Sequence, residues 1–286
     1  MKFAVVGGDR RSALLSAMLA QDGHRVHSFA LERAELPSEI PKTGCLEGCV
    51  YGADCVVLPV PAERGGRLFA PLASEEQTME RVIGALWPGQ LLCGGAFSRE
   101  SSLEAIRAGL SVRDLTQCRS FTVGNAAVTA EGAIELLMKS SARTLWRSRI
   151  LVTGWGRVAK LVALRLGALG ARVTVAARKE GDRAMASALG FGAMDFKRPE
   201  GAPEPFDFLV NTVPAPVIGG ELLSLLREDA LLLELASPPG GFDRAAAEQA
   251  GLRTLSAPGL PGICAPYTAA ELMQAAIFDV LREREE

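Results

Sequence analysis

A glycine-rich loop at residues 154–159, GWGRVA, offers the clearest chemistry in the sequence. It follows the apolar run Ile150–Val152 and opens a helical pattern over 157–169. In such a loop the first glycine allows a tight turn, the second lets the backbone approach a pyrophosphate, and the third small residue lets helix and strand pack closely. The helix amino terminus offers free N–H groups to phosphates. The order strand, loop, helix, strand predicts a dinucleotide site, with a bare packing turn as the alternative; the predicted ligands are Gly154, Trp155, Gly156, Arg157 and Val158.

The end of the next strand indicates which dinucleotide binds. Domains that bind NAD place Asp or Glu there to accept a hydrogen bond from the ribose 2′-OH. This chain has Ala177 at that position, followed by Arg178 and Lys179, and Glu180 comes too late. A carboxylate repels a 2′-phosphate, whereas a guanidinium binds it in a fork. The sequence therefore predicts NADP, with Arg178 as an ordinary surface charge as the alternative.

Two further loops follow strands of the same half and are expected at the nicotinamide. One contains Asn211, Thr212, Val213 and Pro214, and the other runs through Ala236 and Ser237 to Gly241. Proline-stiffened loops can hold backbone donors and acceptors against a carboxamide. Simple turns are the alternative interpretation.

The elements that must position these loops alternate between strands and helices throughout. The first half has predicted strands at 2–6, 24–29, 54–60, 90–93 and 111–115, with helices between them. The second half repeats the pattern from Arg149, with predicted strands ending near 154, 178, 212, 236 and 257. Such alternation indicates βαβ units and parallel sheets. The predicted fold is α/β with two doubly wound parallel-sheet domains, the second a Rossmann NADP-binding domain, joined by long helices.

The predicted domain boundaries follow from this pattern. Residues 1–125 form a flavodoxin- or Rossmann-like domain on the substrate side, and 126–148 form a linker helix. Residues 149–267 form the NADP-binding domain, and a last helix at 268–286 packs back on the first domain. The apolar linker helix is also a possible homo-oligomer interface, although core packing explains it equally well.

Composition excludes several classes of function. The net charge of −2 argues against nucleic-acid binding, and no apolar run is long enough to span a membrane. The amino terminus has no signal-peptide pattern, so export is not expected. Only two histidines are present, and the six cysteines form no CxxC pair, so neither a His-centred triad nor a metal site is expected.

The motifs together resemble one enzyme family. In order they are GGD at 7–9, LPV at 58–60, TAEG at 129–132, GWGRVA, AAR at 176–178, NTVP at 211–214, LASPPGG at 235–241 and APGLPGICAP at 257–266. This series is similar to that of the family of dipicolinate synthase A subunits, over nearly the whole chain. The resemblance implies a two-domain NADP-binding protein related in fold to hydroxyacid and alanine dehydrogenases. It also implies a flavoprotein-like B subunit as partner and the mother-cell cytoplasm of a sporulating bacterium as location.

The implied reaction oxidises dihydrodipicolinate, formed from 4-hydroxy-tetrahydrodipicolinate, to dipicolinate. Because aromatisation drives it, the enzyme must chiefly position two carboxylates. The expected anchors are the backbone of Gly7 and Gly8, Ser237, and the helix that begins near Thr268, with Arg10 and Arg11 within reach. A solvated helix start is the alternative for both arginines, and capping is the favoured role of Asp9.

Other site residues follow from the family pattern. Asn125, Thr129 and Glu131 match it, and Leu260 lies in its APGLPG segment. Glu131 is expected to accept the proton, since a partly desolvated carboxylate gains basicity, or else to be a helix-surface residue. Tyr267 stands where the family usually has Lys, so a phenolic hydrogen bond or another cation must replace that contact.

Two other functions remain open on the sequence alone. The chain can be a non-catalytic NADP-binding subunit whose partner performs the redox step. It can also be a related oxidoreductase acting on an oxo or hydroxy acid.

Overall fold

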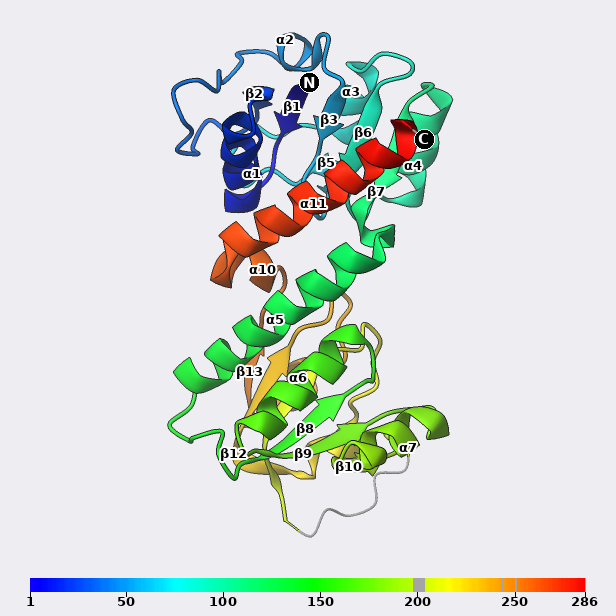
Figure 1. Ribbon diagram of the computed structural model, residues 1–286. Helices are drawn as coiled ribbons and strands as arrows, with labels where there is room; N and C mark the ends of the chain where they lie inside the picture. The colour runs from blue at the N-terminus through cyan, green and yellow to red at the C-terminus, as the bar shows by residue number, and fades with distance from the viewer. Residues whose placement is uncertain (198–203, 243, 250, 286) are drawn as a thin grey trace. The chain divides into compact units, whose positions relative to one another are not determined.

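The computed structural model describes residues 1–197, 204–242, 244–249 and 251–285, and these form two compact units. Unit 1 comprises Met1–Asn125 and Ala265–Glu286, and unit 2 comprises Ala126–Cys264. The two units are shown in Figure 1, coloured along the chain. Each unit is built on its own parallel sheet.

The sheet of unit 1 has the order β2-β1-β3-β6-β7 among the described residues, and every pairing is parallel. The central strands β1, β3 and β6 are apolar and buried, as is typical of parallel sheets covered on both faces. The strands are β1 (Lys2–Val6), β2 (Arg25–Phe29), β3 (Cys55–Val57), β6 (Leu91–Gly94) and β7 (Ser111–Asp114).

Six helical segments and one hairpin complete unit 1. They are α1 (Arg10–Gln21), α2 (Leu46–Val50), α3 (Met79–Gly84), α4 (Arg99–Arg107), the 3-10 helix at Leu115–Gln117, α11 (Pro266–Glu285), and the hairpin of β4 (Glu63–Arg64) and β5 (Arg67–Leu68). Helix α11 shares a core with α1, where Leu15 and Leu19 are buried together with Met273 and Ile277. The carboxyl-terminal helix is therefore part of the hydrophobic core of unit 1. Residue 286 lies outside the described residues.

The sheet of unit 2 has the order β10-β9-β8-β11-β12-β13, again all parallel. Counted within the unit, this is the doubly wound dinucleotide-binding order, which reverses between β8 and β11. The strands are β8 (Arg149–Thr153), β9 (Arg172–Ala176), β10 (Gly192–Met194), β11 (Phe206–Asn211), β12 (Leu226–Glu234) and β13 (Arg253–Ser256). The helices are α6 (Arg157–Ala168), α7 (Glu180–Ala188), α8 (Gly220–Leu223), α9 (Arg244–Gln249) and α10 (Leu260–Cys264). The predicted fold class, α/β with two doubly wound parallel sheets, is confirmed.

Helix α5 (Arg119–Lys139) differs from the predicted linker helix in both of its ends. It begins earlier because Phe121 is buried in the core of unit 1. It ends at Lys139, well before the predicted end at 148; the polar pair Ser140-Ser141 follows, and the Ser141 hydroxyl accepts a hydrogen bond from the N–H of Arg143 at 2.9 Å. Serine competes for backbone hydrogen bonds and so favours helix ends.

Strand β3 is shorter than the predicted strand at 54–60. It stops at Val57, and the carbonyl of Pro59 accepts a hydrogen bond from the N–H of Gly95 instead. A proline has no N–H to continue a ladder, so Pro59 and Pro61 end the strand.

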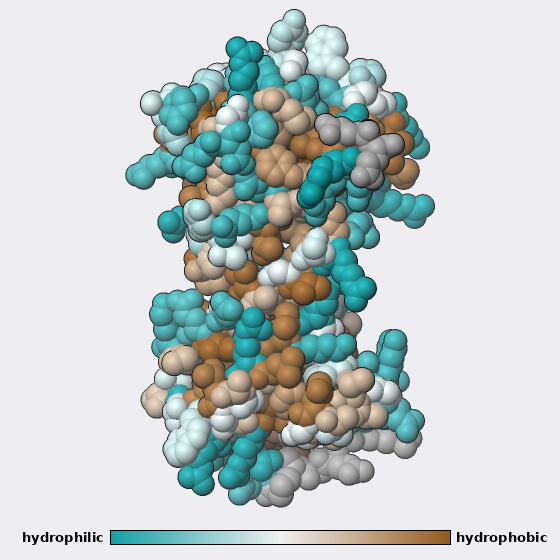
Figure 2. Space-filling view, in the orientation of Figure 1, coloured by the Kyte–Doolittle hydropathy of each residue, from teal (hydrophilic) through white to brown (hydrophobic). Residues whose placement is uncertain are grey.

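Surface hydropathy is mixed in both units, as Figure 2 shows. Exposed apolar side chains of unit 2 include Leu164 of α6, Leu169 at the end of α6 and Leu189 at the end of α7. Within the part of the chain that the structure describes, no helix is both long enough and apolar enough to cross a membrane.

Candidate dinucleotide site

The loop after β8 requires glycine at its first position for two reasons. Gly154 has a φ of +94°, a conformation that side chains rarely adopt. A Cβ there would also lie 2.7 Å from the Thr212 hydroxyl and 2.9 Å from a Val213 methyl. The backbone of this loop therefore packs directly against the loop after β11, at the point where the strand order reverses.

The second glycine leaves room for a ligand. Gly156 is the N-cap of α6, and no side chain caps this helix end. A Cβ added at Gly156 would meet no protein atom within 4 Å. The space beside the first turn of α6 is therefore open, and the uncapped N–H groups of such a turn can bind phosphate oxygens. The third small residue, Ala159, is buried between helix and sheet.

Two predicted cofactor ligands have buried side chains. The indole of Trp155 packs edge-on against Phe191, with ring centroids 6.2 Å apart, and the Lys160 ammonium lies 5.7 Å from the indole. Leu260 lies in the core of unit 2. Both side chains therefore pack within unit 2, and the predicted cofactor contacts of Trp155 and Leu260 stay predictions.

The turn after β9 presents cations and no carboxylate. Ala177 is buried, while Arg178 and Lys179 are exposed. Arg183 of α7 donates to the carbonyls of Ala177 and Arg178, at 2.9 and 2.8 Å, and pairs with Asp195 at 3.1 Å. Arg183, which the sequence analysis missed, therefore fixes the turn that carries Arg178.

The side chain of Asn211 is engaged within the protein, and the predicted place of its loop at the cofactor stays a prediction. Its amide donates to the Val213 carbonyl and to Glu234, and its oxygen accepts from the Thr153 hydroxyl and the Val213 N–H. The side chain is fully buried and its hydrogen-bonding capacity is used within the protein. Thr212 likewise donates its hydroxyl to the Thr153 carbonyl, at 2.7 Å.

Glu234 is the other site residue that sequence reasoning missed. It ends β12, its side chain is buried, and it accepts from Asn211, from the N–H of Ala236 at 2.9 Å and from the N–H of Gly241 at 2.7 Å. A carboxylate within the apolar run ALLLELA was the available signal, because buried acids are rare unless partnered. The loop it holds leaves Ser237 exposed and Ala236 half-buried; Val213 is half-buried and Pro214 exposed in the neighbouring loop.

In unit 1 the first glycine loop is filled by protein. Gly7 and Gly8 are buried, and a Cβ at Gly7 would lie 2.6 Å from Leu68. A Cβ at Gly8 would collide with Ser12. These glycines serve close packing over the end of β1, and the N–H of Gly7 donates to the Phe29 carbonyl at 2.9 Å; the predicted role of their backbone as substrate anchors stays a prediction.

The residues after that loop stabilise α1. Asp9 is the N-cap and accepts from the N–H of Arg11, as the favoured capping role predicts. The buried Arg11 guanidinium pairs with Asp9 at 2.8 Å and donates to the Val60 carbonyl at 2.6 Å. Neither alternative for Arg11 is correct, since it is neither solvated nor free to reach a ligand. Arg10 is exposed.

The remaining candidates lie on two helices. Asn125 and Thr129 are half-buried on α5 and belong to unit 1 and unit 2, respectively. The side chain of Glu131 is 68% exposed and faces Arg165 at 3.4 Å, so the expected desolvation is absent. Tyr267 and Thr268 are exposed in the first turn of α11 in unit 1.

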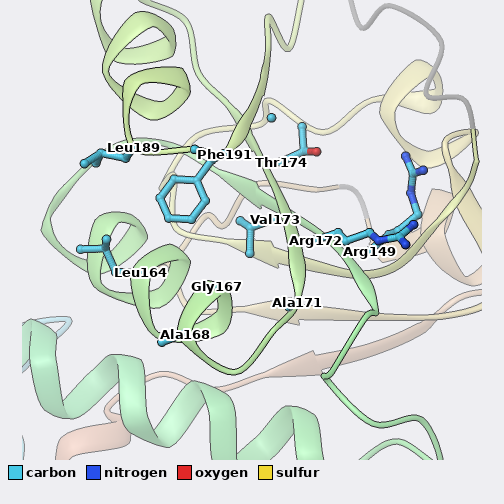
Figure 3. Close-up of a pocket in the computed structure, with 12 residues that line it drawn as sticks. Arg149, Leu164, Gly167, Ala168, Ala171, Arg172, Val173, Thr174, Leu189 and Phe191 are labelled. Carbon is cyan, nitrogen blue, oxygen red and sulfur yellow. The ribbon is translucent and has the colours of Figure 1, made fainter.

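A cavity of about 630 Å³ in unit 2 lies away from the glycine loop. Arg149 and Arg172, the first residues of β8 and β9, line it together with Leu164 and Phe191. Figure 3 shows the two guanidinium groups on one side and the apolar side chains on the other. Since ligands of doubly wound sheets bind at the carboxyl ends of strands, this cavity is not the dinucleotide site.

No three His, Cys, Asp or Glu side chains of the described ranges are grouped as a metal ion would need.

The comparisons with known proteins agree along the whole chain. Residues 2–116 match the family model of the N-terminal domain of the dipicolinate synthase A subunit. The chain is 28% identical to the dipicolinate synthase A subunit of Bacillus subtilis (strain 168), covering 99% of this chain and 96% of that protein.

Solved structures of the same kind superpose closely. The crystal structure of the dipicolinate synthase A chain from Bacillus subtilis has a TM-score of 0.85 at 27% identity, covering 100% of this chain and 98% of that one. The structure of the A subunit from Bacillus halodurans has a TM-score of 0.83 at 24% identity over 98% and 97% of the two chains, which supports the fold. The glycine loop, the sheet order and these matches together support the resemblance of the chain to the family of dipicolinate synthase A subunits.

Proposed function

We propose that the chain is an NADP-dependent oxidoreductase that converts dihydrodipicolinate, formed from 4-hydroxy-tetrahydrodipicolinate, into dipicolinate. The observation that carries the proposal is the open cradle at Gly156, at the uncapped amino terminus of α6. It lies beside the reversal of strand order in a sheet with the dinucleotide-binding topology. The resemblance to dipicolinate synthase A subunits supports the substrate class.

The residues of unit 2 fit an NADP molecule in three ways. The first turn of α6 offers N–H groups to the pyrophosphate, and Gly156 leaves the space for it. The exposed Arg178 and Lys179 would bind the 2′-phosphate, with Arg183 holding their turn. Thr212, Val213, Pro214, Ala236 and Ser237 lie on the two loops proposed for the nicotinamide half.

When bound, NADP⁺ would supply the hydride acceptor for the oxidation of a ring carbon of the substrate, with release of a proton, so that the products would be dipicolinate, NADPH and H⁺. Formation of the aromatic ring drives this step, so the chain's own task is to bind, orient and exclude water. A strong general base is not required, and exposed Glu131 does not have the environment of one.

Substrate carboxylates need cations or N–H donors. Arg10, Tyr267 and Thr268 are the exposed predicted candidates of unit 1, whereas Gly7 and Gly8 are covered.

The relatives are named as the A subunit of their enzyme, which implies a partner, and we propose a flavoprotein-like B subunit for this chain too. The proposal also includes the family's location in the cytoplasm of the mother cell.

The direct test combines purified chain, NADP⁺ and freshly generated 4-hydroxy-tetrahydrodipicolinate, with and without the B subunit. Dipicolinate is quantified by chromatography and NADPH by its absorbance. Equal amounts of both products from the chain alone support the proposal. Product only with the B subunit, despite NADP⁺ binding, would instead favour a cofactor-holding role. Absence of product in both mixtures, with a competent substrate confirmed, would contradict the proposed reaction.

A further inference from the structure

Three residues at the ends of neighbouring strands form one buried polar row in unit 2. Thr153 pairs in register with Asn211, and Asn211 pairs in register with Glu234. Hydrogen bonds join them in sequence: the Thr153 hydroxyl donates to Asn211 at 2.5 Å, and the Asn211 amide donates to Glu234 at 2.6 Å. All three side chains are at most 5% exposed.

The row ends in a carboxylate whose described partners are all N–H donors. Glu234 accepts from Asn211, Ala236 and Gly241, and no cation of the described residues pairs with it. Burying an unpaired charge costs folding free energy, which these three donors only partly offset. An apolar side chain at this place would cost less, so the carboxylate points to a positional requirement.

The row fixes two loops to each other. Glu234 binds the N–H groups at both ends of the loop Ala236–Gly241, while Asn211 binds both main-chain groups of Val213 in the other loop. The Gly241 carbonyl then accepts from the N–H groups of Val217 and Ile218. Gly241 approaches Asn211 so closely that a Cβ would collide with the amide.

The two loops belong to one half of the dinucleotide site. A doubly wound sheet consists of two mononucleotide-binding halves, and the glycine loop and Arg178 lie on the half formed by β8, β9 and β10. The loops held by the row follow β11 and β12, on the other half. We infer that Thr153, Asn211 and Glu234 are positioning residues that fix the surface for the nicotinamide half of NADP, without contacting the cofactor themselves. This inference rests on the proposed function.

The test compares two probes on the full chain. NADP⁺ occupies both halves, whereas adenosine 2′,5′-bisphosphate occupies only the adenosine half. In Glu234→Gln, the NH₂ group of the new side chain replaces one of the two carboxylate oxygens. It then faces an N–H donor of Asn211, Ala236 or Gly241 instead of accepting from it, so we expect the two loops to separate. The dissociation constant of NADP⁺ is expected to rise about tenfold, whereas that of the fragment stays within about twofold.

Two further variants keep the test informative. Glu228→Gln makes the same change at an exposed position on β12 and should alter neither affinity. Thr153→Val removes only the hydroxyl at nearly constant volume. It should raise the dissociation constant of NADP⁺ as well, but by less than Glu234→Gln does. Amide hydrogen exchange should rise at Ala236–Gly241 in Glu234→Gln and remain unchanged at Gly154–Arg157.

The outcomes separate the two proposals. Equal weakening of NADP⁺ and the fragment in Glu234→Gln would show a general structural role and overturn the inference. Unchanged NADP⁺ affinity in both Glu234→Gln and Thr153→Val would overturn it as well. If the wild-type chain binds neither probe, the proposed function itself fails, and the inference fails with it.

Discussion

Among single residues, Gly156 combines an ordinary backbone conformation with empty surroundings. Its φ is not in the left-handed region, and an added Cβ would touch no protein atom. Gly156→Val should therefore fold normally and fill the space proposed for the pyrophosphate. We expect NADP⁺ affinity to fall by at least about tenfold, measured by calorimetric titration.

Gly44→Val is the matched control for this substitution. Gly44 also has open space around its Cα, but it lies in unit 1. It should leave both the thermal unfolding temperature and NADP⁺ affinity close to wild type. Retention of full NADP⁺ affinity by Gly156→Val would contradict the site.

For Glu131, in contrast to Gly156, we predict that substitution has little effect. Because its carboxylate is exposed and faces Arg165 across 3.4 Å, it lacks the burial that a general base at this position would need. Glu131→Gln should keep turnover within about threefold of wild type, since positioned acid–base groups typically contribute about a hundredfold or more. A loss of a hundredfold in kcat, with unchanged NADP⁺ affinity, would restore Glu131 as the proton acceptor.

The residues that the sequence predicted best act through local backbone geometry. Gly154 and Gly156 could be assigned because a turn and a helix start are encoded within six neighbouring residues. The buried hydrogen bonds of the Asn211 side chain could not be predicted, because its partner Glu234 lies 23 positions away and only the register of β11 with β12 brings them together. Arg11 was misjudged for the same reason, since the Val60 carbonyl reaches it through the fold.

At the level of elements, hydrophobic patterning placed most of the buried strand segments well, but it missed the first four residues of β12, the hairpin and strand β10. The hairpin of β4 and β5 turns at Gly65-Gly66, both with positive φ, and a two-glycine turn between short strands was a signal that went unused. Edge strand β10 has too few apolar residues to show a period. The end of α5 at Ser140 depended on polar competition for the backbone, which apolar periodicity does not report.

Helix α2 provides an element-scale prediction about thiol chemistry. Burial raises the pKa of the Cys49 thiol to about 12, whereas Cys45 at the start of the helix is exposed. Since the thiolate is the nucleophile, iodoacetamide at about pH 8 should label Cys45 and leave Cys49 unlabelled in the folded chain. Peptide mass spectrometry measures this, and Cys45→Ser should remove the fast label.

The raised pKa of the Cys49 thiol also determines whether its contribution to the free energy of unfolding rises or falls with pH. Between about pH 9 and about pH 12 the folded chain keeps the Cys49 proton that the unfolded chain releases. The folded state then binds more protons, so the free energy of unfolding contributed by this group falls as the pH rises through that range. Labelling of Cys49 as fast as Cys45 would contradict its burial.

For the whole molecule, the sequence predicted two parallel-sheet units because two series of strands and helices are visible in it. The structure adds the strand order, which sequence patterning does not specify, and that order locates the reversal between β8 and β11. It also shows that α11, at the far end of the chain, completes the core of unit 1 together with α1. Long-range partners of this kind arise from topology rather than from local propensity.

The central claim, that unit 2 binds NADP through the glycine loop and Arg178, is tested most directly by one titration. The full chain and Arg178→Ala are each titrated calorimetrically with NADP⁺ and NAD⁺. We predict that the wild type binds NADP⁺ at least about tenfold more tightly than NAD⁺, and that Arg178→Ala weakens NADP⁺ selectively. Equal affinity for the two dinucleotides, or a preference for NAD⁺, would contradict the account.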